Sequence, residues 1–303
     1  MIENTRNIAI IAHVDHGKTT LVDKLLQQSG TLGERASAPE RVMDSNDLEK
    51  ERGITILAKN TAINWRGYHI NVVDTPGHAA VGGEVERILS MFDSVLLLVD
   101  AVDGPMPQTR FVTQKAFAQG LNPIVVVNKI DRPGARPDWV VDQVFDLFDR
   151  LGATDEQLDF PIIYASALEG YATEALEIEN DDMQPLLEAI IKHVNPPQVD
   201  RDGPLQMQIS ALDYSNYVGT IGIGRVTRGV LQSKMPVSII DKNDHKRSGR
   251  IGQIFAFKGL EREEVDSASA GDIVCVTGIE NIHISDTLCT PGEEEKLPAL
   301  TVD

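Results

Sequence analysis

The sequence predicts an α/β domain with a mostly parallel, doubly wound sheet, followed by a small antiparallel β-barrel domain. Three observations predict this fold class. Short apolar runs alternate with helix-like segments over the first part of the chain, as expected of a parallel sheet covered on both faces. A helix-like segment then ends at two consecutive prolines. Beyond them, short alternating segments lie between frequent glycines, which is typical of a barrel.

Five short apolar runs are predicted to form the buried strands of the first domain. They are residues 7–12, 70–74, 94–100, 123–128 and 162–166. Helices are predicted over 19–26 and 182–194, where apolar residues recur three or four positions apart. The segment Asn195-Pro196-Pro197 ends the second helix, because proline cannot continue one. The first domain is therefore predicted to span residues 1–197.

Residues 198–303 are predicted to form the barrel, since segments such as 205–209 alternate apolar and polar residues. Within the first domain, the periodicity fades between Gly30 and Glu51 into polar, charged and small residues. A loop of that length inside a compact domain is usually functional or disordered. We interpret it as a mobile switch.

Composition restricts the partners and the compartment. The formal net charge of -18 argues against binding bare DNA or RNA through this chain alone. A ribonucleoprotein partner stays open, because charge beyond a Debye length of about 8 Å is mostly screened. There is no apolar stretch long enough for a transmembrane helix and no secretory leader pattern at the N-terminus. Two cysteines without metal-ligand spacing, Cys275 and Cys289, suggest buried thiols in a reducing compartment, the cytoplasm.

Residues 12–19 match the phosphate-binding loop pattern, except that Ala12 stands at the usual first glycine. Main-chain N–H groups at the start of the following helix would face the β-phosphate. Lys18 would supply charge to the β- and γ-phosphates, and the Thr19 hydroxyl would be a ligand for Mg²⁺. The residues predicted to bind the nucleotide here are Asp15, His16, Gly17, Lys18, Thr19 and Thr20. A metal site at His13 and His16 is the disfavoured alternative, because both lie in a loop that must wrap phosphate.

A base-reading motif, Asn128-Lys129-Ile130-Asp131, follows a predicted buried strand. Asp131 would accept two hydrogen bonds from guanine N1–H and the exocyclic amine, which adenine cannot donate. A site built on such bonds can reject the wrong base by roughly 10⁴–10⁵. Asn128 would tie the base pocket to the phosphate loop, and the Lys129 stem would cover the purine face. The segment Ser166-Ala167-Leu168 would complete the pocket through a main-chain N–H to guanine O6.

Two further segments carry the predicted chemistry. Asp74, at the end of a predicted strand, would hold Mg²⁺ through a water. The Gly77 N–H would meet the γ-phosphate, and His78 would orient the attacking water as the catalytic residue. Thr55 could add its hydroxyl and carbonyl to the Mg²⁺ and γ-phosphate shell. Loss of the γ-phosphate would then release both segments, which is the order–disorder switch of GTPases.

Together these residues resemble the translational GTPases, the family that includes elongation factor G and LepA. The resemblance rests on residues 12–20, 44–56, 104–110, 224–229 and 270–274, and it spans essentially the whole chain. It implies a P-loop GTPase domain followed by the family's β-barrel, with ribosome-stimulated hydrolysis of GTP and Mg²⁺ as cofactor. It also implies that Val14 and Ile54 form an apolar gate beside His78. That gate would keep the water unactivated until the ribosome moves it.

The sequence departs from the family pattern at Ala80-Val81, where Asp-Phe is usual, while residues 82–87 remain as in the family. An aspartate just before a helix can cap it, and alanine there costs about 0.5–2 kcal/mol. We hypothesise a looser second switch with nucleotide binding intact. Substituting Ala80→Asp together with Val81→Phe is expected to raise ribosome-stimulated GTP turnover, and an unchanged turnover would refute the hypothesis.

The family normally continues past residue 303 with further ribosome-facing domains, so the chain is expected to be an N-terminal two-domain portion. Ribosome binding through RNA and proteins would then need the remaining domains, whereas membrane and DNA binding are not expected. The chain could be an enzyme that switches on the ribosome in translation, subunit assembly or stress adaptation. It could instead be a regulatory module in which occupancy by GTP or GDP suffices. An adenine-specific ATPase is a third reading, and Asp131 argues against it.

Overall fold

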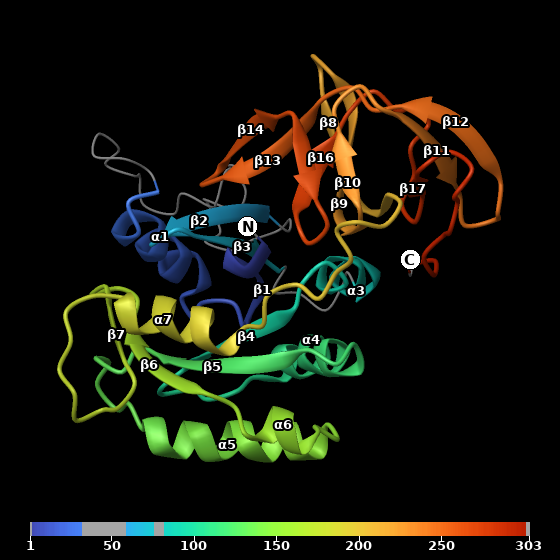
Figure 1. The fold of residues 1–303 in the computed structure, drawn as a ribbon. Helices are drawn as coiled ribbons and strands as arrows, with labels where there is room; N and C mark the ends of the chain where they lie inside the picture. Colours follow the sequence, from blue (N-terminus) through green and yellow to red (C-terminus); the bar gives the residue numbers. More distant parts are fainter. Residues whose placement is uncertain (1, 32–58, 76–81, 301–303) are drawn as a thin grey trace.

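The computed structural model describes residues 2–31, 59–75 and 82–300, and its first domain is built on a seven-stranded sheet (Figure 1). The strand order is β2-β3-β1-β4-β5-β6-β7. The neighbours β3, β1, β4, β5 and β6 run parallel, while β2 and β7 pair antiparallel at the two edges. The predicted mostly parallel sheet is confirmed. The strands are β1 (Thr5–Ala12), β2 (Lys59–Trp65), β3 (Tyr68–Asp74), β4 (Ser94–Asp100), β5 (Asn122–Asn128), β6 (Ile162–Ser166) and β7 (Tyr171–Thr173).

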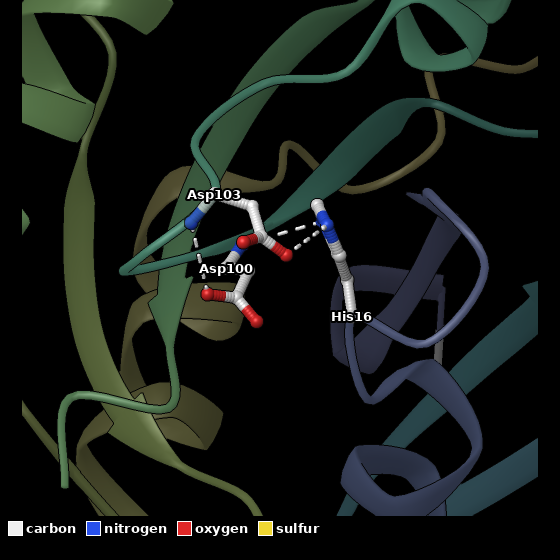
Figure 2. Close-up of side chains that lie close together, drawn as sticks. All are labelled: His16, Asp100 and Asp103. Atoms are coloured by element: carbon white, nitrogen blue, oxygen red, sulfur yellow. Dashed lines mark hydrogen bonds and ion pairs between the residues drawn. The ribbon is translucent and has the colours of Figure 1, made fainter. Parts of the chain in front are cut away.

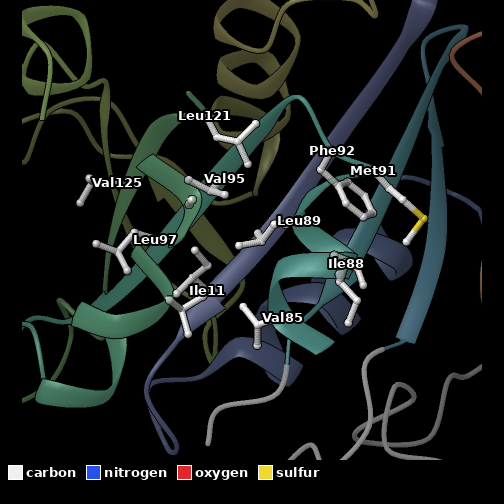
Figure 3. Close-up of a cluster of buried hydrophobic side chains, with 14 of the residues drawn as sticks. Ile11, Val85, Ile88, Leu89, Met91, Phe92, Val95, Leu97, Leu121 and Val125 are labelled. Carbon is white, nitrogen blue, oxygen red and sulfur yellow. The ribbon is translucent and has the colours of Figure 1, made fainter. Parts of the chain in front are cut away.

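Helices cover both faces of this sheet, as the doubly wound prediction requires. Residues of α3, α4 and α5 pack in one apolar core, part of which is drawn in Figure 3, and residues of α1 and α7 pack in the other. Strand β1 alternates between them, with Ile11 in the first core and Ile10 in the second. The elements are η1 (Ile2–Asn4), α1 (Lys18–Gln28), α3 (Gly82–Leu89), α4 (Pro107–Ala118), α5 (Pro137–Arg150), α6 (Asp155–Leu158) and α7 (Gln184–His193).

The second domain is a curved β structure whose described strands pair antiparallel, and it has its own apolar core. Its main sheet has the order β12-β11-β17-β8-β9-β16-β13-β14, and a separate ribbon pairs β10 with β15. This agrees with the predicted small β-barrel. The strands are β8 (Gln206–Ser215), β9 (Gly219–Arg228), β10 (Val230–Gln232), β11 (Pro236–Ile240), β12 (Lys246–Arg250), β13 (Ile254–Lys258), β14 (Glu261–Val265), β15 (Ser267–Ser269), β16 (Ile273–Val276) and β17 (Thr287–Cys289).

Polar bonds and a shared apolar core join the two domains. The Asn7 side chain donates to the Gly271 carbonyl at 3.0 Å, and Arg225 forms an ion pair with Asp93 at 2.9 Å. Ala62 of the edge strand β2 exchanges main-chain hydrogen bonds of 2.9 and 3.1 Å with Gly259 of the barrel. The apolar core under α3 also includes barrel side chains. The barrel is therefore attached beside the sheet edge that carries β2 and β3.

Several sequence predictions fall outside the described residues. The predicted switch over 30–51 is described only at its first two residues, and Ile54, Thr55, Gly77, His78, Ala80 and Val81 lie outside the described residues. Both cysteines are free and buried, as predicted. Within the described ranges, no helix is both long and apolar enough to cross a membrane.

Candidate nucleotide-binding site

The candidate site lies at one edge of the first sheet, where the parallel strands end. Because these strands are parallel neighbours, their carboxyl ends meet at this edge, and ligands of open α/β sheets bind at such an edge. The phosphate-binding loop follows β1, which lies between β3 and β4 in the sheet. The residues that follow the strands here are 13–17 after β1, Thr75 after β3, 101–103 after β4, 129–131 after β5 and 167–168 after β6.

The phosphate-binding loop turns sharply between β1 and α1. Asp15 and Gly17 have φ angles of 68° and 98°, and Gly17 is the residue before the helix begins at Lys18. The left-handed conformation favours glycine at position 17. A Cβ atom there would also overlap the side-chain amide of Asn128. Glycine at 17 therefore allows both the turn and the close approach of the base-reading loop.

Lys18 is held at the end of β3. Its ammonium group lies 2.7 Å from Asp74 Oδ1 and donates to the Thr75 carbonyl. Lys18 is 8% exposed and Asp74 is fully buried. The Thr75 hydroxyl in turn donates to the Ile10 carbonyl at 2.6 Å, which fastens the end of β3 to β1. The cation is thus fixed between the phosphate-binding loop and the end of β3.

Asn128 connects the phosphate-binding loop with the loop after β6. Its side-chain NH₂ donates to the His16 carbonyl at 2.8 Å, and its side-chain oxygen accepts from the Ala167 N–H at 2.9 Å. The side chain is buried, with 1% exposure. Losing such a buried bridge leaves main-chain polar groups unpaired, which costs about 1–3 kcal/mol for each group. One amide therefore sets the distance between two segments that are 151 residues apart in the chain.

Lys129 and Asp131 differ in their surroundings. Lys129 has a φ of 63°, and its ammonium group donates to the Asp15 carbonyl and lies 3.4 Å from Asp100 Oδ2. Asp131 is exposed, whereas the intervening Ile130 N–H donates to the Ala165 carbonyl at 3.2 Å. The Asp131 carboxylate therefore stands in solvent beside a loop that is itself held to β6.

The loop after β6 is fixed at its start and open at its end. Ser166 is buried, and its hydroxyl accepts from the Glu169 N–H at 3.2 Å. Ala167 is also buried, but Leu168 is 68% exposed. The predicted base-reading residues at 128–131 and 166–168 are thus brought to the same edge of the sheet. Thr19 and Thr20, at the start of α1, and Val14, in the loop before it, are half-buried there.

His16 faces two aspartates from the end of β4 (Figure 2). The Asp100 N–H donates to His16 Nδ1 at 3.3 Å, while Nε2 lies 3.8 Å from Asp103 Oδ2. Burial lowers the pKa of His16 to about 4, although the negative charge of Asp100 acts in the opposite direction and raises it. The ring is therefore neutral at pH 7, with its hydrogen on Nε2 because Nδ1 is an acceptor.

This neutral His16 predicts a pH dependence of stability. The unfolded chain takes up the imidazole proton near pH 6.5, and the folded chain only near pH 4. The unfolded state thus binds more protons between these values, so the free energy of unfolding should fall as the pH is lowered. On lowering the pH toward 4, the free energy of unfolding of wild type should fall by about 3 kcal/mol more than that of His16→Gln. Urea unfolding of both proteins from pH 4 to 7 measures it, and equal pH slopes would contradict it.

The chemistry of the three side chains does not favour a metal ion at His16, Asp100 and Asp103. Their ligand atoms lie within 4.8 Å of one another. However, a metal on His16 Nε2 would require a hydrogen on Nδ1, which already accepts from the Asp100 N–H. The cations of Lys129 and Arg132 also lie 3.4 and 3.2 Å from the Asp100 carboxylate. We interpret the cluster as a polar support behind the phosphate-binding loop.

Sequence reasoning missed Asp100, Asp103 and Thr75 as site residues. Asp100 was predicted only as the last residue of a strand, and Thr75 only as part of the segment that begins at Asp74. The available signal is position, because Asp74, Asp100 and Asn128 each end a parallel strand. A polar residue at such a strand end is a candidate for the shared edge.

Two family comparisons agree with this geometry. The elongation factor Tu GTP binding domain family matches residues 3–196, and elongation factor Tu domain 2 matches residues 219–289. The chain therefore belongs to the elongation factor Tu GTP-binding domain family, with the family's second domain after it. These two domains define the class as translational GTPases.

Within that class, the chain is similar to proteins of the BipA type, also called TypA. It is 70% identical to the large ribosomal subunit assembly factor BipA of Haemophilus influenzae over 303 residues, which are 100% of this chain and 49% of that protein. The BipA proteins of Salmonella typhimurium and Buchnera aphidicola are 69% and 62% identical, over 100% and 99% of this chain and 50% and 49% of their own lengths. The chain spans about half the length of these curated relatives.

Proposed function

We propose that this chain binds GTP and GDP with Mg²⁺ and hydrolyses GTP to GDP and phosphate, as the switching part of a ribosome-associated factor. The observation that carries the proposal is the bridge made by Asn128, which bonds to both the His16 carbonyl and the Ala167 N–H. The two joined loops would hold the phosphate end and the base end of one nucleotide. Membership of a GTP-binding domain family supports guanine as the base.

The phosphates would lie on the loop before α1. Main-chain N–H groups from Asp15 to Thr20 would donate to the phosphate oxygens, helped by the positive end of the helix. Lys18 would transfer its contact from Asp74 and the Thr75 carbonyl toward the β- and γ-phosphates. The preformed turn at Gly17 means that little main-chain ordering is needed on binding.

The guanine would lie between Lys129 and the loop after β6. Asp131 would accept from N1–H and the exocyclic amine, and its exposed carboxylate is accessible for this. The Lys129 stem would cover one face of the purine. A main-chain N–H at 166–168 would donate to O6. The Ala167 N–H already donates to the Asn128 side chain. Leu168, which is exposed, is thus the more accessible donor.

Mg²⁺ fits the oxygen donors at the start of α1 and at the end of β3. Thr19 offers a hydroxyl and Asp74 a buried carboxylate, and hard oxygen ligands of this kind suit Mg²⁺. Asp74 would act through a water, and Thr55 would add a further oxygen. When bound, the ion neutralises charge on the β- and γ-phosphates during phosphoryl transfer.

Hydrolysis would depend on residues that follow β3. His78 would orient the attacking water, Gly77 would donate to the γ-phosphate, and Val14 with Ile54 would form the apolar gate. The described structure supports this by fixing the preceding Thr75 to both β1 and Lys18. Thr75, the last described residue before Gly77 and His78, is therefore held beside the phosphate-binding loop.

The process served is proposed from the relatives. Their printed name is large ribosomal subunit assembly factor, so subunit assembly is favoured over general translation or stress adaptation. The ribosome, through its RNA and proteins, would be the partner, the compartment would be the cytoplasm, and no role for a membrane or DNA is proposed. Because the relatives are about twice as long, the ribosomal contacts are proposed for the longer protein.

A turnover assay tests this proposal. The chain alone is expected to hydrolyse GTP slowly, whereas ribosomes or large subunits should stimulate a full-length protein of this type, by up to about 10⁵-fold. His78→Ala should abolish the stimulated rate without weakening GDP binding. Stimulated turnover that survives this substitution would contradict the role of His78. A protein that binds neither GTP nor GDP would contradict the whole proposal.

A binding module that only senses GTP or GDP is the second candidate. One observation favours it. The described bonds position the two loops that would bind the nucleotide, whereas none of them acts on the hydrolytic step. If His78→Ala leaves the biological role intact while Lys18→Ala removes it, occupancy is sufficient.

A further inference from the structure

Asp100 contacts both loops of the proposed nucleotide site, although no motif includes it. It ends β4, and its side chain is completely buried. Its main-chain N–H donates to His16 in the phosphate-binding loop at 3.3 Å (Figure 2). Its carboxylate lies 3.4 Å from the ammonium group of Lys129 in the base-reading loop. The contacts therefore converge on Asp100 from β1 on one side and β5 on the other.

We propose that Asp100 is a positioning residue for guanine-nucleotide binding, which holds Lys129 against the phosphate-binding loop. This inference rests on the proposed function of the site. The Lys129 ammonium group is shared between the Asp100 carboxylate and the Asp15 carbonyl. Asp100 thus fixes the head of the lysine whose stem would lie along the purine. Asp100 itself would not touch the nucleotide.

The Asp100 carboxylate is itself held rigidly. Oδ1 accepts from the N–H groups of Val102 and Asp103, at 2.7 and 3.2 Å. Burial opposes its ionisation, but these two N–H groups and the Lys129 cation together keep the pKa of Asp100 below its usual value. The charged carboxylate therefore presents Oδ2 to the cations in one fixed direction. A rigid anion can order a long side chain that would otherwise sample several rotamers.

A fixed Lys129 side chain would favour the binding of GTP and of GDP equally. The lysine side chain is 32% exposed, so one side of its stem is open where the purine would lie. Ordering the stem before binding reduces the entropy lost when the purine is bound. Lys129 would contact the base and not the γ-phosphate, so its contribution to the binding free energy should be the same for GTP and GDP. Loss of Asp100 should therefore weaken GTP and GDP binding by the same factor.

Arg132 provides a comparison within the same cluster. Its guanidinium lies 3.2 Å from Asp100 Oδ2, but the side chain is 47% exposed. No described bond links Arg132 to the phosphate-binding loop. We therefore expect Arg132 to balance the buried charge from the solvent side without ordering the base pocket. Arg132→Gln should leave GDP affinity within about twofold of wild type, since exposed ion pairs contribute little.

A double-mutant cycle with Lys129 tests the inference, with GDP and GTP as the probes in calorimetry on the whole chain. Asp100→Asn keeps the side-chain shape and an oxygen for the Val102 N–H, but removes the charge that faces Lys129. This substitution is expected to lower the affinity for both GDP and GTP by about 10-fold. Lys129→Met should weaken binding in wild type but add little in the Asp100→Asn background, because the two residues act through one contact.

The control is Asp93→Asn, which removes the carboxylate that pairs with Arg225 between the domains. This variant should lower the thermal midpoint without changing GDP affinity. If Asp100→Asn lowers only the midpoint, or if its effect simply adds to that of Lys129→Met, the positioning role is wrong. If Asp100→Asn does not fold, Asp100→Ser enters the same cycle with the same criteria. Absence of GTP and GDP binding by wild type would instead overturn the proposed function, and the inference with it.

Discussion

Replacing Lys18 with methionine is expected to weaken GTP and GDP binding by at least about 100-fold. The methionine keeps an unbranched stem but removes the ammonium group that lies at the Asp74 carboxylate and the Thr75 carbonyl. A hydrogen bond to a charged group contributes about 1.5–3 kcal/mol, and each 1.4 kcal/mol is tenfold in affinity. Loss of two such bonds to the phosphates gives the expected factor. Calorimetry with GDP and Mg²⁺ measures it.

Lys24→Met is the matched control for that experiment, because Lys24 lies on the same helix and no ion pair with it is described. It should leave the affinity unchanged. Lys18→Met also removes one partner of a buried ion pair, which is destabilising, so the thermal midpoint of each variant is measured first. Lys18→Arg keeps the charge in a larger, planar group that does not fit the same contacts, and it should bind nucleotide poorly even if Lys18→Met unfolds. Affinity within threefold of wild type in either variant would contradict the role of Lys18.

The parts of the fold that were predictable from sequence are those with a strong local pattern. Strand β4 is a continuous apolar run, and its predicted bounds agree with the structure. Helix α7 was predicted over 182–194, within two residues of its start and one of its end, because its apolar spacing and the following prolines are local features. In contrast, β2 has the mixed sequence Lys-Asn-Thr-Ala-Ile-Asn-Trp and was not predicted. It is an edge strand, and it is stabilised by pairing with β3 and by a contact with the barrel.

The residues of the candidate site also fall into those that a local sequence pattern predicts and those that it does not. Lys18 and Asp131 could be predicted because their motifs combine residue type and spacing. Asp100 could not, because its partners, His16 and Lys129, are brought to it only by the order β1-β4-β5 in the sheet. Periodicity identifies a strand but does not say which strands are its neighbours. The Asn128 bridge lies between these cases, since its connection to the phosphate loop was predicted and the geometry contains that bond.

Asp131→Asn is expected to change the base that the site prefers. The carboxylate would accept two hydrogen bonds from guanine, and an asparagine would offer an NH₂ donor in place of one acceptor. Xanthine carries a carbonyl where guanine carries the exocyclic amine, so the variant should bind xanthosine triphosphate more tightly than GTP. Affinity for GTP should fall by at least about 100-fold, because the NH₂ group of the new asparagine would face the exocyclic amine of bound guanine, donor against donor, in place of a hydrogen bond.

The exposure of Asp131 makes this substitution a sensitive test. No ion pair with Asp131 is described, and substitutions at exposed positions usually change stability by less than about 0.5 kcal/mol. A changed affinity would therefore report recognition of the base rather than loss of the fold. Asp146→Asn, which removes an exposed charge from α5, is the control for net charge and should leave GTP binding unchanged. If Asp131→Asn still prefers GTP to xanthosine triphosphate, the base is read by another group, and the loop after β6 becomes the first place to look.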